Sequence, residues 1–213
     1  PRIASAVEPA FGILQFRTRH DLETPACLTT GTCFLALEEE DDPAGWLAGL
    51  RAVGDLAVLH WDRAVPWLVF DPDPPPGVDR VAFYDARLDA PTVAWIDAFA
   101  VHFAAMPKGY LAVSLLDGER DRLSALHLGL GSAQRFTTRC PDFSPGTQVT
   151  VDPGTGPRTF DLARSYRNFV LYLARKLAPD HLALMVEANL LARTCPARAD
   201  GLYALYRRLY DEV

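Results

Sequence analysis

The stretch GYLAVSLL, residues 109–116, is the clearest indication of the fold in this sequence of 213 residues. Its apolar residues are continuous rather than alternating, which is typical of a strand that is covered on both faces in a parallel sheet. Three further runs have the same character: TCFLAL at 32–37, DLAVLH at 55–60 and HLALMV at 181–186. The sequence therefore predicts four short strands of one parallel sheet.

Stretches with helical periodicity follow the predicted strands. In residues 91–109 and 161–179, apolar side chains recur three and four positions apart, as in a helix with one buried stripe. Residues 42–54 and 195–213 are also predicted to be helical, because an Asp-Pro and a Cys-Pro pair near their starts resemble helix N-termini. Four strand–helix units in succession predict an α/β fold of the parallel (β/α) barrel type, a half or partial TIM barrel.

Segments outside these units set the domain organisation. Residues 30–213 are predicted to form the barrel-type domain, and residues 1–29 an N-terminal arm. The apolar stretch FGILQF, at 11–16, is either an added strand or part of that arm. Two long loops, at 70–89 and 127–159, follow the second and third strands. Both therefore lie at the carboxyl ends of strands, where α/β proteins build their sites.

Composition argues against several classes of function. The formal charge of −6 and the isoelectric point of about 5.3 argue against nucleic acid as a partner. No apolar stretch reaches the roughly 18 residues of a membrane span, and the first residues do not resemble a signal peptide, so we expect no membrane anchor. The compartment stays open, and secretion is compatible with the sequence.

Cofactor and metal motifs are absent from the sequence. It contains no GxxxxGK[ST], no GxSxG and no HExxH, and GLGSAQ at 129–134 lacks the strand and helix that a dinucleotide site requires. The four cysteines show no CxxC pair and no zinc-ligand spacing. Cys27 and Cys33 either close a small disulfide loop or stay free. We therefore expect no cofactor and no metal.

Polar and aromatic side chains follow three of the predicted strands. Because the carboxyl ends of barrel strands converge, we expect these side chains to share one cleft. They are His60, Trp61, Asp62 and Trp67 after the second strand, Asp117 and Arg120 after the third, and Glu187 and Asn189 after the fourth.

This mixture of side chains suits a carbohydrate. The C–H faces of a sugar lie on aromatic rings, and its hydroxyl groups pair with charged or amide side chains. Glycoside cleavage also needs a carboxylic acid beside the leaving oxygen, and Glu187, after five apolar residues, is placed where partial desolvation suits that role. A second carboxylate is required, for which Asp62 and Asp117 are the candidates.

Each of these residues also has a purely structural interpretation. Glu187 can pair with Arg193 or cap the segment that follows it. His60 can be a hydrogen-bonded core residue, and Trp67 can be part of the core packing. Asp117 begins a common turn signal and is followed by residues that can form a solvated charge cluster.

Three stretches carry a resemblance to a known family. DLAVLHWDRAVPW, GYLAVSLLDGERDRL and DHLALMVEANLL, the last followed by LYALYRRLYDEV, are similar to the second, third and fourth strand–helix units of bacterial (β/α)8-barrel glycoside-hydrolase-like proteins related to the arabinogalactan endo-β-1,4-galactanases. The similarity covers about residues 30–213. It implies that Glu187 is the acid/base. In the larger clan an asparagine directly precedes this glutamate, whereas here Val186 precedes it and Asn189 follows two positions later.

The resemblance reaches only the N-terminal half of the barrel and does not include the family's nucleophile, which lies near the seventh strand. Three explanations are open: a part of a longer protein, a half-barrel that pairs with another and self-associates, or an N-terminal arm and long loops that cover the gap. We favour the first two. The leading hypothesis is a glycoside-hydrolase-like protein that binds or cleaves a glycan. A non-catalytic carbohydrate-binding or assembly module is the alternative. A third hypothesis is an α/β enzyme that acts on a small acid through His60 and Arg120.

Overall fold

The computed structural model describes residues 12–14, 56–61, 64–129 and 131–213. The predicted strand at 32–37, the predicted helix at 42–54, the Cys27–Cys33 loop and Asp62 lie outside the described residues.

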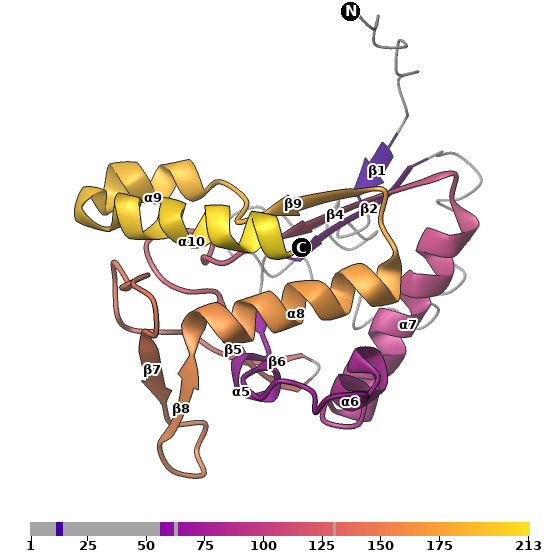
Figure 1. The fold of residues 1–213 in the computed structure, drawn as a ribbon, viewed down its shortest axis with the longest axis horizontal. Helices are drawn as coiled ribbons and strands as arrows, with labels where there is room; N and C mark the ends of the chain where they lie inside the picture. The colour runs from indigo at the N-terminus through magenta and orange to yellow at the C-terminus, as the bar shows by residue number, and fades with distance from the viewer. Residues whose placement is uncertain (1–11, 15–55, 62–63, 130) are drawn as a thin grey trace, which may run out of the picture.

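The centre of the fold is a four-stranded parallel sheet (Figure 1). Its strands lie in the order β1 (Gly12–Leu14), β2 (Leu56–Trp61), β4 (Lys108–Val113) and β9 (His181–Leu184). The last three confirm three predicted strands. The first falls within the apolar stretch at 11–16, so this stretch supplies a strand beside β2.

The strand order equals the chain order, and this determines where the helices lie. Right-handed crossovers, the rule for parallel units, place successive helices on one face when the strand order does not reverse. Trp61 of β2 makes edge-to-face contacts with Trp95 of α7 (Ala90–Ala105) and Phe169 of α8 (Leu162–Leu177), at ring-centroid distances of 5.2 and 5.1 Å. Both helices therefore cover the same face. The α/β fold with a parallel sheet is confirmed, and the sheet formed by the described strands is open rather than closed into a barrel.

Local sequence explains where the two long helices begin and end. Asp89 caps α7 by accepting a hydrogen bond from the Thr92 N–H at 3.0 Å, and Asp161 caps α8 in the same way. Ala178, in the left-handed conformation, ends α8. The predicted apolar stripe of α8 is fully buried, and it comprises Tyr166, Phe169, Val170, Leu173 and Leu177.

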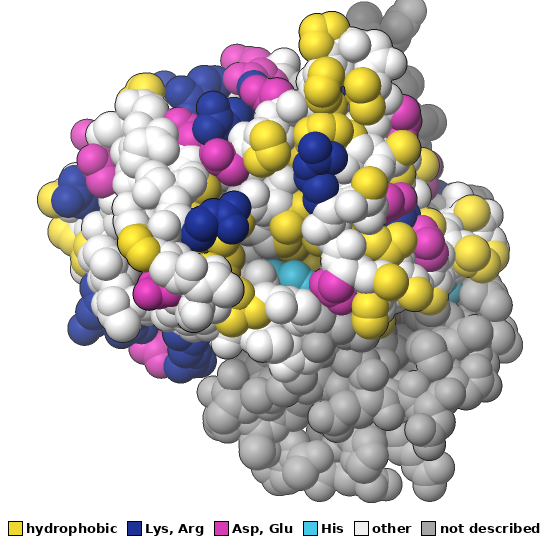
Figure 2. Space-filling view, turned by 90° about the horizontal axis from the view of Figure 1, so that it is seen from below, with side chains coloured by type: hydrophobic (Ala, Val, Ile, Leu, Met, Phe, Trp, Pro, Cys, Tyr) yellow, Lys and Arg dark blue, Asp and Glu magenta, His cyan; other side chains and the backbone are white. Residues whose placement is uncertain are grey.

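Ion pairs hold α8 to the segment that follows β2, which contains the short helices α5 (Trp67–Phe70) and α6 (Arg80–Asp85). Lys176 Nζ lies 2.7 Å from Asp85 Oδ1, and Arg167 Nη2 lies 2.6 Å from Asp73 Oδ1. Figure 2 shows acidic and basic side chains interspersed on the face seen there. Among the described residues, this face therefore shows no patch of a single charge.

The predicted loop at 127–159 is more ordered than expected. It contains most of β5 (Ala125–Gly129), then β6 (Ser132–Gln134) and β7 (Gln148–Val151), and it reaches into β8 (Arg158–Asp161). A short strand, β3 (Ala64–Val65), pairs with β5 to form a second sheet with β6, while β7 and β8 form a separate antiparallel hairpin. Figure 1 shows this hairpin projecting from the body on the side where β9 ends.

The C-terminal region contains more elements than predicted. The predicted helix at 195–213 consists of a 3-10 turn, η1 (Pro196–Arg198), and α10 (Ala199–Glu212). The unpredicted helix α9 (Ala188–Thr194) precedes them and begins directly after Glu187.

Candidate functional site

Glu187 and Arg120 join the loops that follow two adjacent strands. The Glu187 Oε2 atom accepts hydrogen bonds from Arg120 Nε at 2.9 Å and from Arg120 Nη2 at 2.6 Å. Arg120 itself is 7% exposed, and its Nη1 atom donates to the carbonyl of Asp117 at 2.6 Å. The side chain of Glu187 is 54% exposed. The structure therefore presents a carboxylate that is fixed from behind by a buried guanidinium and open to solvent in front.

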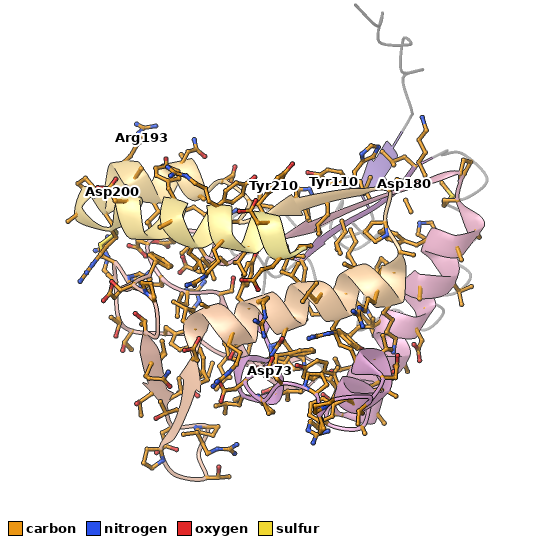
Figure 3. All side chains as sticks on the ribbon, viewed as in Figure 1. Asp73, Tyr110, Asp180, Arg193, Asp200 and Tyr210 are labelled. Atoms are coloured by element: carbon orange, nitrogen blue, oxygen red, sulfur yellow. A yellow bond between two sulfur atoms is a disulfide. The ribbon has the colours of Figure 1, made fainter. Side chains whose placement is uncertain are left out.

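This pairing answers two questions that the sequence left open. Glu187 pairs with Arg120 rather than with Arg193, which points outward from α9 (Figure 3). All three nitrogen atoms of the Arg120 guanidinium donate hydrogen bonds within the protein. The small-acid hypothesis loses its main ligand, because Arg120 has no nitrogen atom left without a partner.

Backbone strain is concentrated around this pair. Five non-glycine residues in the described part of the chain have positive φ, and four of them lie here. They are Arg120, Cys140, Met185 and Glu187, with φ between 51° and 59°. The left-handed conformation costs roughly 1–2 kcal/mol for each such residue, and strain of this kind clusters at functional sites.

The strained turn between β9 and α9 is held from below by α8. The buried Tyr166 hydroxyl donates to the Val113 carbonyl at 2.7 Å and accepts from the Met185 N–H at 3.1 Å. Burial raises the pKa of Tyr166 far above its ordinary value, so the hydroxyl keeps its proton. One side chain therefore fixes both the end of β4 and the turn that positions Glu187.

Asp117 offers a second carboxylate in the same loop. The Arg120 N–H donates to the Asp117 carbonyl at 3.0 Å, so the predicted turn is present. The Asp117 Oδ2 atom lies 3.6 Å from Arg122 Nη1, while its Oδ1 atom is buried and has no hydrogen-bond partner within the described residues. A buried acceptor without a donor costs free energy, and this oxygen atom is not accessible from solvent.

A buried aspartate and a disulfide brace this region. Asp121, 1% exposed, accepts a 2.6 Å hydrogen bond from Arg139 Nε, and its carbonyl accepts from the Cys140 N–H at 2.7 Å. Cys140 is bonded to Cys195, which ends α9, with 5.5 Å between the Cα atoms. This disulfide was not predicted from the sequence, because a separation of 55 residues gives no spacing signal.

The two tryptophans proposed to stack on a sugar lie in the core, so that assignment is corrected. Trp61 is 6% exposed between α7 and α8. Trp67 is fully buried, stacks on Phe160 with 5.3 Å between ring centroids, and donates its indole N–H to the Ser124 carbonyl at 2.9 Å. Neither ring has a face open to a ligand, because the burial of these large apolar surfaces dominates.

The remaining predicted site residues are separated. His60 lies on the sheet face opposite to Trp61, since successive side chains of a strand alternate, and its ring centroid is 6.0 Å from that of Tyr110. Asn189 is exposed in the first turn of α9, two residues after Glu187. The structure therefore brings together Glu187, Arg120 and the Asp117 carbonyl, with Asn189 nearby in the chain.

The described residues contain neither a metal-binding group nor a membrane-spanning helix. No group of three His, Cys, Asp or Glu side chains in that part of the chain is arranged to hold a metal ion. None of its helices is long and apolar enough to cross a membrane. Comparison with known protein families, curated proteins and solved structures gives no match to this chain.

Proposed function

We propose that this chain is a carbohydrate-active, glycoside-hydrolase-like protein that binds or cleaves a glycan at the carboxyl ends of its parallel strands. The observation that carries the proposal is the Arg120–Glu187 pair, which joins the loops after β4 and β9 in a strained, braced region. Fixed carboxylates and guanidinium groups at such strand ends are typical of (β/α) barrel sites.

In this proposal Glu187 is the acid/base, and Arg120 orients its carboxylate. The half-exposed Glu187 oxygen atoms are reachable by a sugar, and Asn189 supplies an amide for its hydroxyl groups. Asp117 is the candidate for the second carboxylate, because it lies in the loop that Arg120 anchors. His60 is a further candidate for a hydrogen bond to the glycan.

We also propose that the α/β fold of this chain is a partial TIM barrel. Four parallel strands in chain order, with α7 and α8 on one face, are the arrangement from which a barrel is built. At the β9 side of the sheet, Leu182, Leu184, Tyr206 and Tyr210 surround an apolar hollow, and Tyr210 is 68% exposed. We propose that the chain associates with itself or with a second half-barrel on this side.

A second candidate function is a carbohydrate-binding module without catalysis. It is favoured by the ion pair that occupies Glu187. In that case the pair is a structural tie, and the exposed polar groups around it only hold the glycan.

Two substitutions distinguish the candidates. We expect Glu187→Gln to reduce release of reducing sugar from a β-1,4-galactan by at least about a hundredfold, as for a lost general acid. Glu119→Gln is the matched control, because Glu119 is a highly exposed carboxylate of the adjacent loop. Both variants should retain the circular dichroism spectrum of the unchanged protein.

The unchanged protein is also tested for glycan binding and for release of reducing sugar. Binding on a glycan array without release of reducing sugar would select the non-catalytic module. If the protein neither hydrolyses nor binds any glycan on the array, the proposed function is refuted.

A further inference from the structure

A groove that the proposed function does not use runs along the β7–β8 hairpin. It has a volume of about 420 Å³. One wall consists of residues 134–138 and the other of residues 147–152, with Leu123, Pro141 and Asp142 completing the lining. Since six consecutive residues of the β7 side line the groove, side chains from both faces of the strand border it. The groove therefore follows the edge of β7 and not only one of its faces.

The hydrogen-bond pattern of the hairpin shows which backbone groups point into this groove. Along an antiparallel pair of strands, opposite residues alternate. In one pair the backbone N–H and C=O groups bond to each other, and in the next pair these groups point away from the partner strand. The Leu162 N–H donates to the Thr147 carbonyl at 3.0 Å, so these two residues face each other. In the register Gln148↔Asp161 and Thr150↔Thr159, Gln148 and Thr150 are then the residues whose N–H and C=O groups point away from β8.

An independent hydrogen bond agrees with this assignment. The N–H of Asp161, the partner of Gln148, points out of the hairpin and donates to Asp71 Oδ1 at 2.8 Å. On the β7 side, the backbone groups of Gln148 and Thr150 make no bond to another backbone segment of the described chain. Both residues are exposed, so this strand edge is open to solvent.

Besides this open edge, the groove has apolar residues at its base and one arginine without a salt-bridge partner among the described residues. Leu123 and Val151 are buried there, and Phe136 packs against Phe160 with 6.3 Å between ring centroids. Arg135 is exposed and has no salt-bridge partner among the described residues.

The acidic groups of the lining are engaged within the protein. Asp142 Oδ1 accepts a 2.8 Å bond from Ser144, and Asp152 Oδ1 accepts from the Gly154 N–H at 2.9 Å. These neutral donors leave both aspartates charged, but they have hydrogen-bond partners, whereas Arg135 has no partner in the described part of the chain, which favours an acidic group placed beside Arg135.

We propose that this groove binds an extended peptide strand carrying an acidic residue, which adds to the free edge of β7. Backbone donors and acceptors two residues apart match the repeat of a peptide strand, and alternate side chains would contact the apolar residues at the base of the groove. The acidic residue would face Arg135. This inference is independent of the proposed glycan site, because it uses none of the residues at the ends of β4 and β9.

The probe is a set of synthetic peptides of about eight residues, in which one glutamate is moved along an alternating valine–threonine sequence. We expect at least one member to bind the full chain at submillimolar concentration and to shift the amide NMR signals of Gln148 and Thr150. Methylation of alternate peptide nitrogen atoms should weaken binding about tenfold, since it removes strand hydrogen bonds but keeps the side chains. Replacing the glutamate with glutamine should weaken binding to the unchanged protein but not to Arg135→Ala.

Two variants at one position test the backbone directly. Thr150→Pro removes the outward N–H without breaking the ladder to β8 and should weaken peptide binding about tenfold. Thr150→Val keeps that N–H and should change binding less than about twofold.

Equal effects of the two Thr150 variants, or unchanged binding of the methylated peptides, would overturn the proposal. So would a set of peptides that does not bind while galactan oligosaccharides shift the Gln148 and Thr150 signals. The methylated peptides keep the test decisive even if Thr150→Pro perturbs the hairpin.

Discussion

Arg120 combines burial, a strained backbone and hydrogen bonds to two loops. Its guanidinium donates to the Glu187 carboxylate and to the Asp117 carbonyl, and its φ is 59°. Such a conformation costs free energy and persists only where the surrounding contacts hold the residue in it. At the scale of single residues, Arg120 is the centre of the candidate site.

We expect Arg120→Ala to lower the free energy of unfolding by about 2–4 kcal/mol, because it removes a buried guanidinium and leaves its partners without donors. Arg193→Ala on the outer side of α9 is the control and should change this free energy by less than about 0.5 kcal/mol. Urea unfolding near neutral pH measures both. Equal values for the two variants would show that the pair contributes nothing to the fold.

Buried tyrosines should make the protein sensitive to alkaline pH. Burial raises the pKa of Tyr84 from 10.0 to about 12, and it raises the pKa values of Tyr166 and Tyr172 further, with the Asp85 carboxylate contributing for Tyr172. Below pH 10 this stabilisation is complete. Above pH 10 the unfolded chain loses protons that the folded chain keeps, so stability falls as the pH rises toward and beyond 12.

Each such tyrosine should steepen the loss by up to about 1.4 kcal/mol per pH unit. Urea unfolding at about pH 9, 10 and 11 gives the slope. Tyr84→Phe should reduce it, whereas Tyr203→Phe, which changes an exposed tyrosine, should not. A slope that is the same in both variants would contradict the assignment.

The candidate site was partly predictable from single residues. Glu187 and Arg120 were identified because polar residues directly after apolar strands stand out. The tryptophans were misassigned, since a ring at a strand end is equally compatible with the core, and Trp61 and Trp67 met apolar partners on α7 and β8. The role of Cys140 depends on a partner 55 residues away, which one sequence does not reveal.

At the scale of elements, Gly109 shows how closely a strand and a helix can approach. A Cβ atom at this position would lie 2.7 Å from Phe103 Cδ1 of α7 and 3.4 Å from Pro179 Cα. The Gly109 N–H donates a hydrogen bond to Asp180 Oδ2 at 2.7 Å. Asp180 lies at the start of β9 in Figure 3. The glycine thus allows the end of α7 and the starts of β4 and β9 to meet.

We expect Gly109→Ala to destabilise the protein by about 1–3 kcal/mol, because the buried Phe103 ring has to move. Gly118→Ala is the matched control, since a Cβ atom there meets no atom within 4 Å. Thermal unfolding of both variants compares the two sites. If Gly109→Ala is as stable as the unchanged protein, the Phe103 ring can move without loss of stability.

The elements predicted correctly were those with a strong hydrophobic pattern, either a continuous apolar run or a helical period. Strands β2 and β4 and helices α7 and α8 each bury several apolar side chains, and Leu182, Ala183 and Leu184 of β9 are partly buried, so hydrophobic pattern alone located these elements. The missed strands β6 and β7 are short and mostly exposed, and their pairing partners, not their own composition, make them strands. Helix α9 has only seven residues and begins at the turn at Glu187. A helix this short has no periodic pattern from which it could be predicted.

At the scale of the whole molecule, the Cys140–Cys195 disulfide joins the two loop systems that surround the strand ends. It links the segment before β7 to the end of α9, across 55 residues of chain. Closing a loop of this length removes conformational freedom from the unfolded chain, worth about 4 kcal/mol in the chain-entropy treatment. The disulfide therefore contributes to global stability and, through α9, to the position of Glu187.

We expect the double variant Cys140→Ser/Cys195→Ser to lose about 2–4 kcal/mol of unfolding free energy in urea without reductant, where any other disulfide is unaffected. Amide hydrogen exchange should accelerate in α9 more than in α8, since α8 is held by its own buried stripe. The double variant and the unchanged protein differ only at these two sulfur atoms, so the comparison isolates the cross-link. A loss below about 1 kcal/mol, with unchanged exchange in α9, would show that packing around Asp121 and Leu191 holds these loops without the disulfide.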